Sequence, residues 1–197
     1  MGTMDDAERV AAETPAEWRA WLEANHERPT GAWLVSWKTH TGRPRMTYEE
    51  SVLEALAFGW VDSKALTLDD ERTMLWFAPR KKGSGWSRPN KQRVELLERE
   101  GRMAPAGRAV IERAKADGSW TLLDAVEDLI VPDDLAAAFA ARPGAGEAWE
   151  AYPRSIKRSA LERLVQARTQ ETRARRVAEI ADAAARGERP GQPARGG

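Results

Sequence analysis

The chain has 197 residues, of which 42% are hydrophobic and 31% charged, and its 31 basic residues balance its 31 acidic residues. Such a chain can bury an ordinary core without a metal or disulfide staple, and its zero net charge does not draw the whole molecule to nucleic acid or anionic lipid. The absence of cysteine excludes disulfides, thiolate nucleophiles and zinc sites with sulfur ligands.

The first predicted elements are a helix, a strand and a second helix. Thr14 and Glu17 form a capping box that predicts a helix over residues 15–25. Residues 31–38 place Trp33, Val35 and Trp37 at a period of two, which indicates a strand with one buried face. A second capping box over residues 47–50 starts a helix that ends near residue 59. Its apolar face contains Leu53, Leu56, Ala57 and Trp60.

The central part of the chain predicts a hairpin, a loop and two more helices. Residues 61–68 and 73–78 have an extended pattern, and with the first strand they indicate a small antiparallel sheet. Residues 80–87 are basic, rich in glycine and without periodicity, so we expect a loop there. Ser87 is a plausible N-cap for a helix over residues 88–99, and a further helix is expected over 105–116.

The rest of the chain predicts helices separated by prolines, at residues 132–141, 143–151, 153–167 and 170–185. We therefore expect an α+β fold, with a small antiparallel β-sheet packed by helices and followed by a helical C-terminal region. The predicted divisions are a flexible N-terminus over residues 1–14, an α+β core region over 15–130, a C-terminal helical region over 131–186, and a disordered tail over 187–197.

Three segments resemble the YdeI/OmpD-associated (bacteriocin-protection) family. Residues 54–63, EALAFGWVDS, are similar to a helix that runs into a strand in that family. Residues 77–90, FAPRKKGSGWSRPN, resemble its loop ending in Trp-Ser-x-x-Asn, and residues 171–176, ETRARR, resemble its C-terminal helix. Together with the order of the elements, the resemblance extends from residue 15 to 190. It implies stress protection or porin association, and neither of these is a chemical reaction.

The loop is also the best candidate for a ligand site. Asp62 and Ser63 begin a strand where Asp62 could pair with Arg80. The glycines beside Lys81 could form an anion-binding concavity at the start of the following helix. The residues proposed to bind a small anionic ligand are Asp62, Ser63, Arg80, Lys81, Trp86, Ser87 and Asn90. The alternative is a structural ion pair next to a solvated loop.

Other features favour structural roles. We expect Trp33, Trp37 and Trp60 in the core, and Trp86 to be the tryptophan most exposed or lining a cleft. The basic surplus over residues 151–177 is expected to be solvated surface, because no nucleic-acid-binding motif accompanies it. His26 is predicted to cap a helix and His40 to lie in a loop, so the chain offers few imidazole bases.

The sequence thus favours a non-enzymatic, cytoplasmic stress-protection or interaction protein, with a protein partner or a small anionic ligand and with no metal or cofactor. We expect no membrane insertion, because no apolar run approaches the roughly 18 residues of a membrane helix, and the first residues lack the pattern of a signal peptide. An enzyme or binding protein for an anionic ligand remains one alternative. A nucleic-acid-binding protein that uses the C-terminal basic helices is another, which we do not expect.

Overall fold

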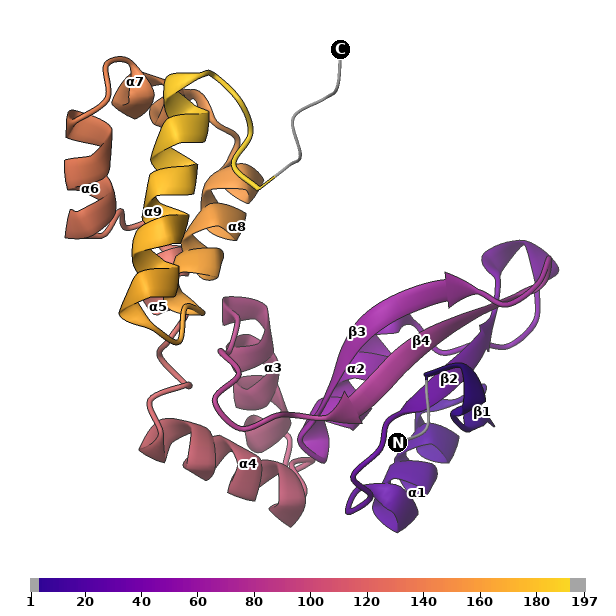
Figure 1. Cartoon of the computed structure of the whole chain (residues 1–197). Helices are drawn as coiled ribbons and strands as arrows, with labels where there is room; N and C mark the ends of the chain where they lie inside the picture. Colours follow the sequence, from indigo (N-terminus) through magenta and orange to yellow (C-terminus); the bar gives the residue numbers. More distant parts are fainter. Residues whose placement is uncertain (1–3, 192–197) are drawn as a thin grey trace. The chain divides into compact units, whose positions relative to one another are not determined.

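The computed structural model describes residues 4–191 and divides the chain into two compact units, Met1–Trp120 and Thr121–Gly197 (Figure 1). The first unit contains a sheet with helices, and the described part of the second contains helices and no strand. The fold is therefore α+β, as predicted. The predicted boundary between residues 130 and 131 falls within the second unit. Residues 192–197 of the predicted disordered tail lie outside the described residues.

The sheet of the first unit has four strands in the order β1-β2-β4-β3. They are β1 (Arg9–Ala11), β2 (Ala32–Trp37), β3 (Trp60–Thr67) and β4 (Arg72–Pro79). The pairs β2–β4 and β4–β3 are antiparallel, as predicted, but β1 pairs parallel with β2 and makes the sheet mixed. The sequence predicted no strand there, because three residues are too short for a pattern and the strand depends on pairing with a distant segment.

Four α-helices accompany this sheet: α1 (Pro15–Asn25), α2 (Tyr48–Ala57), α3 (Arg88–Arg99) and α4 (Pro105–Ala116). Both predicted capping boxes are present at the starts of α1 and α2. Short 3-10 turns occur at η1 (Met4–Asp6) and η2 (Thr39–Thr41). The local signals therefore placed these helix starts correctly.

The main core of the first unit lies on the side of the sheet that α1 and α2 cover. It includes Trp18, Leu34, Leu56, Trp60 and Phe77, each at most 2% exposed. Neighbouring residues along a strand point to opposite faces. Trp33 therefore lies on the other face, where it forms a smaller buried cluster with Met74 and Trp76.

The prediction that Trp37 belongs to the core is wrong. Its side chain is half-buried, its indole N–H donates to the Glu13 carboxylate at 2.9 Å, and the Arg43 guanidinium lies 4.3 Å from its ring centre. The period of two correctly showed that Trp33 and Trp37 share a face. It could not show that the larger core lies on the opposite face.

The second unit is a group of helices packed around α9. The helices are α5 (Asp124–Glu127), α6 (Asp133–Ala140), α7 (Ala145–Ala151), α8 (Arg154–Val165) and α9 (Gln170–Ala185). Ile180 of α9 is fully buried among side chains that include Leu135, Trp149 and Leu161. Within residues 4–191, no helix has the length and apolar character needed to cross a membrane.

Candidate functional site

Arg80 follows β4 and turns its side chain into the first unit. Its backbone N–H donates to the Gly59 carbonyl at 3.0 Å, its guanidinium lies 4.0 Å from the centre of the Trp86 ring, and its Nη2 donates to the Gly85 carbonyl. Only 7% of Arg80 is exposed, and its Nε has no hydrogen-bond partner. Burial lowers the pKa of Arg80 to about 10. The group is thus a buried cation held by a ring and a carbonyl.

The sequence predicts Trp86 to be exposed or to line a cleft. It is not exposed, since only 1% of it reaches solvent, but it does line the small hollow between the loop and α4. Its ring contacts the Arg80 guanidinium and also Trp120, whose ring centre is 5.0 Å away. An indole has a large apolar surface, and burying that surface is strongly favourable. The loop sequence has no periodicity that could have shown this burial.

The glycine-rich loop directs one amide at a carboxylate of the chain itself. Hydrogen bonds from Ser119, the positive charge of Lys82 and the backbone N–H of Gly83 lower the pKa of Asp117, which caps the C-terminal end of α4. The hollow between the loop and α4 has a volume of about 10 Å³, room for about one water molecule. The loop was predicted to bind an external anion. One of its amides instead donates to the chain's own Asp117 carboxylate.

Asp62 and Arg80 form no ion pair, so the predicted contact between them is wrong. The Asp62 carboxylate instead accepts a hydrogen bond from the Tyr48 hydroxyl at 2.9 Å. Burial and this carboxylate raise the pKa of Tyr48. Asp62 pairs with Phe77 across the hairpin, and Arg80, three residues beyond Phe77, turns toward Trp86. The pairing of β3 with β4 brings the two backbones close, but the two side chains contact different partners.

Asn90 belongs to the polar group around Arg93. The Asn90 Oδ1 accepts from Arg93 at 2.7 Å, and Arg93 also binds both oxygens of Glu49, at 2.8 and 2.6 Å. Asp62 is close enough to this group that its charge contributes to raising the pKa of Arg93. The structure thus brings Asp62 and Asn90 together around Tyr48, Glu49 and Arg93, three residues that local patterns did not indicate.

The other predicted site residues take separate places. Ser63 is exposed on β3, and Lys81 is exposed on the loop. Ser87 occupies the N-cap position of α3 as predicted, but its hydroxyl makes no capping hydrogen bond, and no acidic residue lies in the first turn of that helix.

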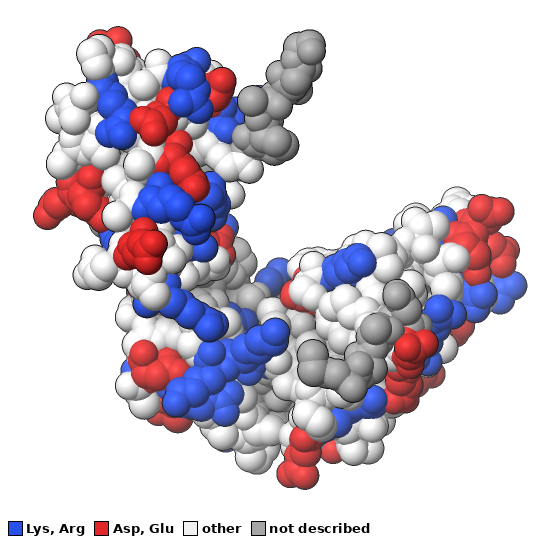
Figure 2. Space-filling model, in the orientation of Figure 1, with Lys and Arg blue, Asp and Glu red and all other residues white. Residues whose placement is uncertain are grey.

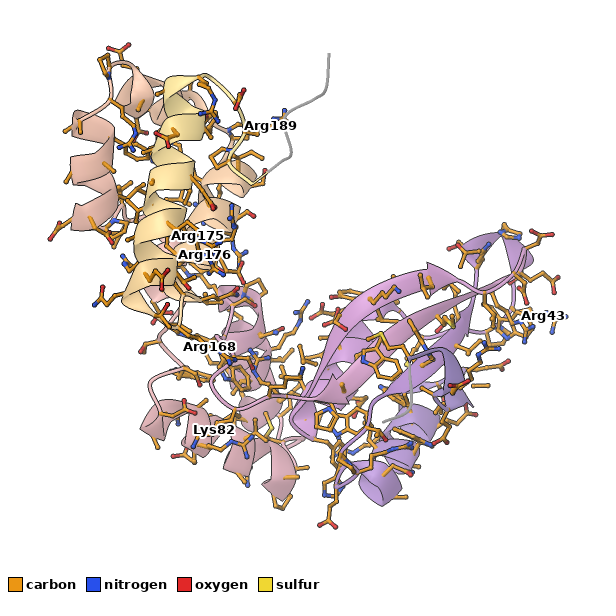
Figure 3. The ribbon with its side chains drawn as sticks, in the orientation of Figure 1. Arg43, Lys82, Arg168, Arg175, Arg176 and Arg189 are labelled. Atoms are coloured by element: carbon orange, nitrogen blue, oxygen red, sulfur yellow. The ribbon has the colours of Figure 1, made fainter. Side chains whose placement is uncertain are left out.

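Positive side chains gather at Trp120 and at the hollow beside Trp86, whose ring contacts Trp120, and we call this group the cationic surface. It consists of Lys81, Lys82, Lys91, Arg113 and Lys115. The ammonium nitrogens of Lys91 and Lys115 lie 5.2 and 5.9 Å from the centre of the Trp120 ring. Figure 2 shows positive side chains gathered over the loop after β4 and over α4, where Figure 3 labels Lys82. Sequence reasoning missed this surface because its members come from the loop, α3 and α4.

The basic side chains of the second unit are largely paired. Arg173 binds Asp134 at 2.6 Å and Arg163 binds Glu179 at 3.0 Å. Arg176 donates a hydrogen bond to the Arg163 carbonyl. Figure 3 also labels Arg168, Arg175 and Arg189 on this unit. The basic surplus in the sequence is therefore partly neutralised by acids on neighbouring helices.

The chain offers few groups for acid–base or metal chemistry. His26 caps the C-terminal end of α1, as predicted, with its Nδ1 3.2 Å from the Leu22 carbonyl oxygen. His40 is exposed in η2. Among residues 4–191, no three histidines or carboxylates come together as metal ligands would.

The fold and these contacts define a two-unit α+β protein, in which a sheet-containing unit with a cationic surface is followed by a helical unit. The chain belongs to the family described as Domain of unknown function (DUF8412), whose model matches residues 10–110, or 101 of the 197 residues. Residues 128–187 match the model described as Bacteriocin-protection, YdeI or OmpD-Associated, which confirms the predicted resemblance for the C-terminal helices. The other two predicted segments, residues 54–63 and 77–90, lie in the part that matches DUF8412. Comparisons with curated proteins and with solved structures find no match.

Proposed function

We propose that this protein is a non-enzymatic, cytoplasmic interaction protein of stress protection, and that its first unit binds an acidic protein segment through the cationic surface. The stress-protection role rests on the family match of residues 128–187. The cytoplasmic location rests on the absence of cysteine, which fits a reducing compartment. The observation that carries the binding role is the gathering of positive side chains at Trp120 and at the hollow beside Trp86.

The charges at this surface favour an acidic partner. Carboxylates offset part of this charge: Glu112 pairs with Lys115 at 2.8 Å, Glu98 also lies near Lys115, and Asp117 lies near Lys82. Lys81 and Arg113 form no ion pair with any described carboxylate. Arg80 adds a buried positive charge below the loop and has no carboxylate partner. A surplus of one sign raises the local concentration and the association rate of an oppositely charged partner.

The arrangement favours an acidic protein segment over nucleic acid. Sequence-independent binding of single strands needs an open aromatic face for base stacking. The Trp120 ring is already flanked by Lys91, Lys115 and Trp86. Exposed acids on the adjoining helices, among them Glu98, interrupt any long track for a phosphate backbone.

The test compares two labelled probes, an octaglutamate peptide and a single-stranded oligothymidylate, by fluorescence anisotropy with the full-length protein. The double variant Lys81→Glu/Lys82→Glu should weaken peptide binding at least fivefold. The matched control Arg45→Glu/Lys64→Glu changes the same charge at exposed positions elsewhere in the first unit and should leave it unchanged. Binding should also weaken as salt rises from about 50 to about 200 mM.

If both double variants lost the same peptide affinity, only the net charge of the protein would matter and the proposed surface would be wrong. If the oligothymidylate bound more tightly than the peptide, the partner would be nucleic acid. The stress role is tested separately. Bacterial cells that produce the wild-type protein should survive a bacteriocin better than cells that produce the Lys81→Glu/Lys82→Glu variant. Equal survival of producing and non-producing cells would contradict it.

A second candidate function is the binding of a small anion where the loop meets α3. It is favoured by the buried charge of Arg80 without a carboxylate partner and by the start of α3, where the N-cap Ser87 makes no side-chain hydrogen bond. A thermal-shift screen with phosphate, sulfate, nucleotides and organic acids tests it. A ligand should stabilise the wild type and not Arg80→Ala, and equal stabilisation of both proteins would exclude this site.

A further inference from the structure

A cavity of about 290 Å³ opens at one edge of the first unit. It lies between η1, the connection from α1 to β2, and strand β4. The lining residues on which its chemistry depends are Met4, Ala7, Glu8, Arg28, Gly31 and Trp76. A cavity of about 150 Å³ takes up one benzene ring, so this one has room for about two fused rings.

The walls of this cavity are fixed by contacts within the unit. Gly31 packs so closely on β4 that an added Cβ would lie 2.4 Å from the Phe77 carbonyl oxygen and 2.4 Å from a ring atom of Trp76. Trp76 also meets Trp33 edge to face, with ring centres 5.1 Å apart. The Trp33 indole N–H in turn donates to the Met4 carbonyl at 2.7 Å and holds η1 in place. A preformed cavity spends little free energy on ordering when a ligand binds.

The charged side chains at the rim already have partners within the protein. The Glu8 carboxylate accepts hydrogen bonds from Arg28 at 2.5 Å and from the Trp21 indole at 3.1 Å. The hydrogen bond from Arg28 is the main cause that lowers the pKa of Glu8, so this pair stays ionised at neutral pH. Arg28 also donates to the Thr30 hydroxyl at 3.3 Å. Asp6, the remaining charged residue of the lining, has a partner in the chain as well.

A charged ligand would therefore lose its hydration without meeting a free counter-charge, which is costly in a partly enclosed site. The remaining lining is apolar and soft: the indole of Trp76, the thioether of Met4 and the methyl group of Ala7. Aromatic pairs gain more free energy than their buried area alone provides. A methionine sulfur beside an aromatic ring adds a further favourable contact.

We infer that this cavity binds a neutral aromatic molecule of about two fused rings, whose ring system packs against Trp76 and contacts Met4. The volume sets the size of the ligand, the engaged rim sets its charge, and the indole sets its aromatic character. This inference goes beyond the proposed function, because no member of the cationic surface lines the cavity.

The test uses probes of similar size: naphthylmethanol, naphthylmethylamine, naphthoate and the saturated analogue decalylmethanol. Each is titrated into the full-length protein while backbone amide and tryptophan indole resonances are followed by NMR. Naphthylmethanol should shift the signals of Ala7, Gly31 and Trp76. The amine and the acid should each bind at least about fivefold more weakly, since their charge is desolvated without a partner. Decalylmethanol should bind about threefold more weakly, because it lacks the aromatic contact.

Variants then locate the binding. Ala7→Phe should fill the cavity and weaken naphthylmethanol binding at least about tenfold, since close-packed interiors leave no room for both rings. The matched control Ala65→Phe adds the same ring at an exposed position of β3 outside the cavity and should have no effect. Thermal melts show whether both variants fold. Met4→Ala shortens a partly exposed wall residue, which keeps the fold intact, and should weaken binding about threefold.

The inference is overturned if naphthylmethanol shifts no signals at the cavity, or if either charged probe or decalylmethanol binds as tightly as naphthylmethanol. It is also overturned if Met4→Ala and a folded Ala7→Phe leave binding unchanged, or if Ala65→Phe weakens binding as much as Ala7→Phe.

Discussion

Glu54 is a buried carboxylate that connects α1, α2 and the segment after α3 in the first unit. Replacing it tests how much this connection stabilises the unit. Its side chain is 5% exposed and lies on α2. It binds Arg19 of α1 at 2.8 Å and Arg102, which follows α3, at 2.5 Å. Arg19 also donates to the Arg102 carbonyl at 3.1 Å. We predict that Glu54→Gln destabilises the first unit, because the amide keeps the volume but removes the buried charge that both guanidinium groups share. Each guanidinium then keeps only a more exposed partner, Glu23 for Arg19 and Glu100 for Arg102.

Removing one partner of a buried ion pair costs about 3–5 kcal/mol. The two arginine side chains are 30% and 38% exposed, so water can solvate them again after the substitution. This exposure reduces the expected loss to about 2–3 kcal/mol. Unfolding entropy is about 2.1 cal/mol/K per residue. For the 120 residues of the first unit, the loss corresponds to a fall in Tm of about 10 °C.

Urea unfolding followed by tryptophan fluorescence measures this loss, because eight of the nine tryptophans lie in the first unit. The control is Glu23→Gln. That carboxylate is 61% exposed and lies 3.6 Å from Arg19, so its loss should cost less than about 0.5 kcal/mol. If Glu54→Gln and Glu23→Gln unfolded at the same urea concentration, the buried ionic connection would contribute nothing and the reasoning would be refuted.

Three further predictions follow from packing and hydrogen bonding. Trp60→Ala should cost about 3–5 kcal/mol, since the residue is 1% exposed in the main core, and a urea-melt loss below about 1 kcal/mol would contradict its core position. Gly107→Ala should cost about 1–3 kcal/mol, because its Cβ would lie 2.2 Å from a carbonyl oxygen. A Cβ at Gly146 would meet open space, so Gly146→Ala should not destabilise the protein. Equal thermal stability of the two glycine variants would contradict the predicted clash at Gly107. Asp62→Asn should lower the pKa of Tyr48, which burial and the Asp62 carboxylate raise, and an unchanged ultraviolet titration would count against the contact. Because folding raises this pKa, its contribution to stability is present below the ordinary tyrosine pKa of about 10 and is lost as the pH rises through the folded value.

The sequence by itself determined the elements whose signals are local. The capping boxes at Thr14 and Thr47 predicted the starts of α1 and α2, because a cap and its helix are only three residues apart. The alternation in β2 and the two extended runs predicted the antiparallel part of the sheet. The segment over residues 171–176 also carried the family resemblance, which the match of residues 128–187 confirms.

Tertiary structure alone decided which side chains of the candidate site meet. Arg80 and Asp62 are near each other in the hairpin register, yet Arg80 stacks on Trp86 and Asp62 binds Tyr48. The cationic surface joins the loop, α3 and α4 around Trp120. Each of these contacts joins segments distant in the sequence, and its formation depends on how much apolar surface the whole unit buries. A pattern of neighbouring residues contains no information on such distant contacts. The burial of Trp86 and the partner of Asp62 could therefore be known only from the folded chain.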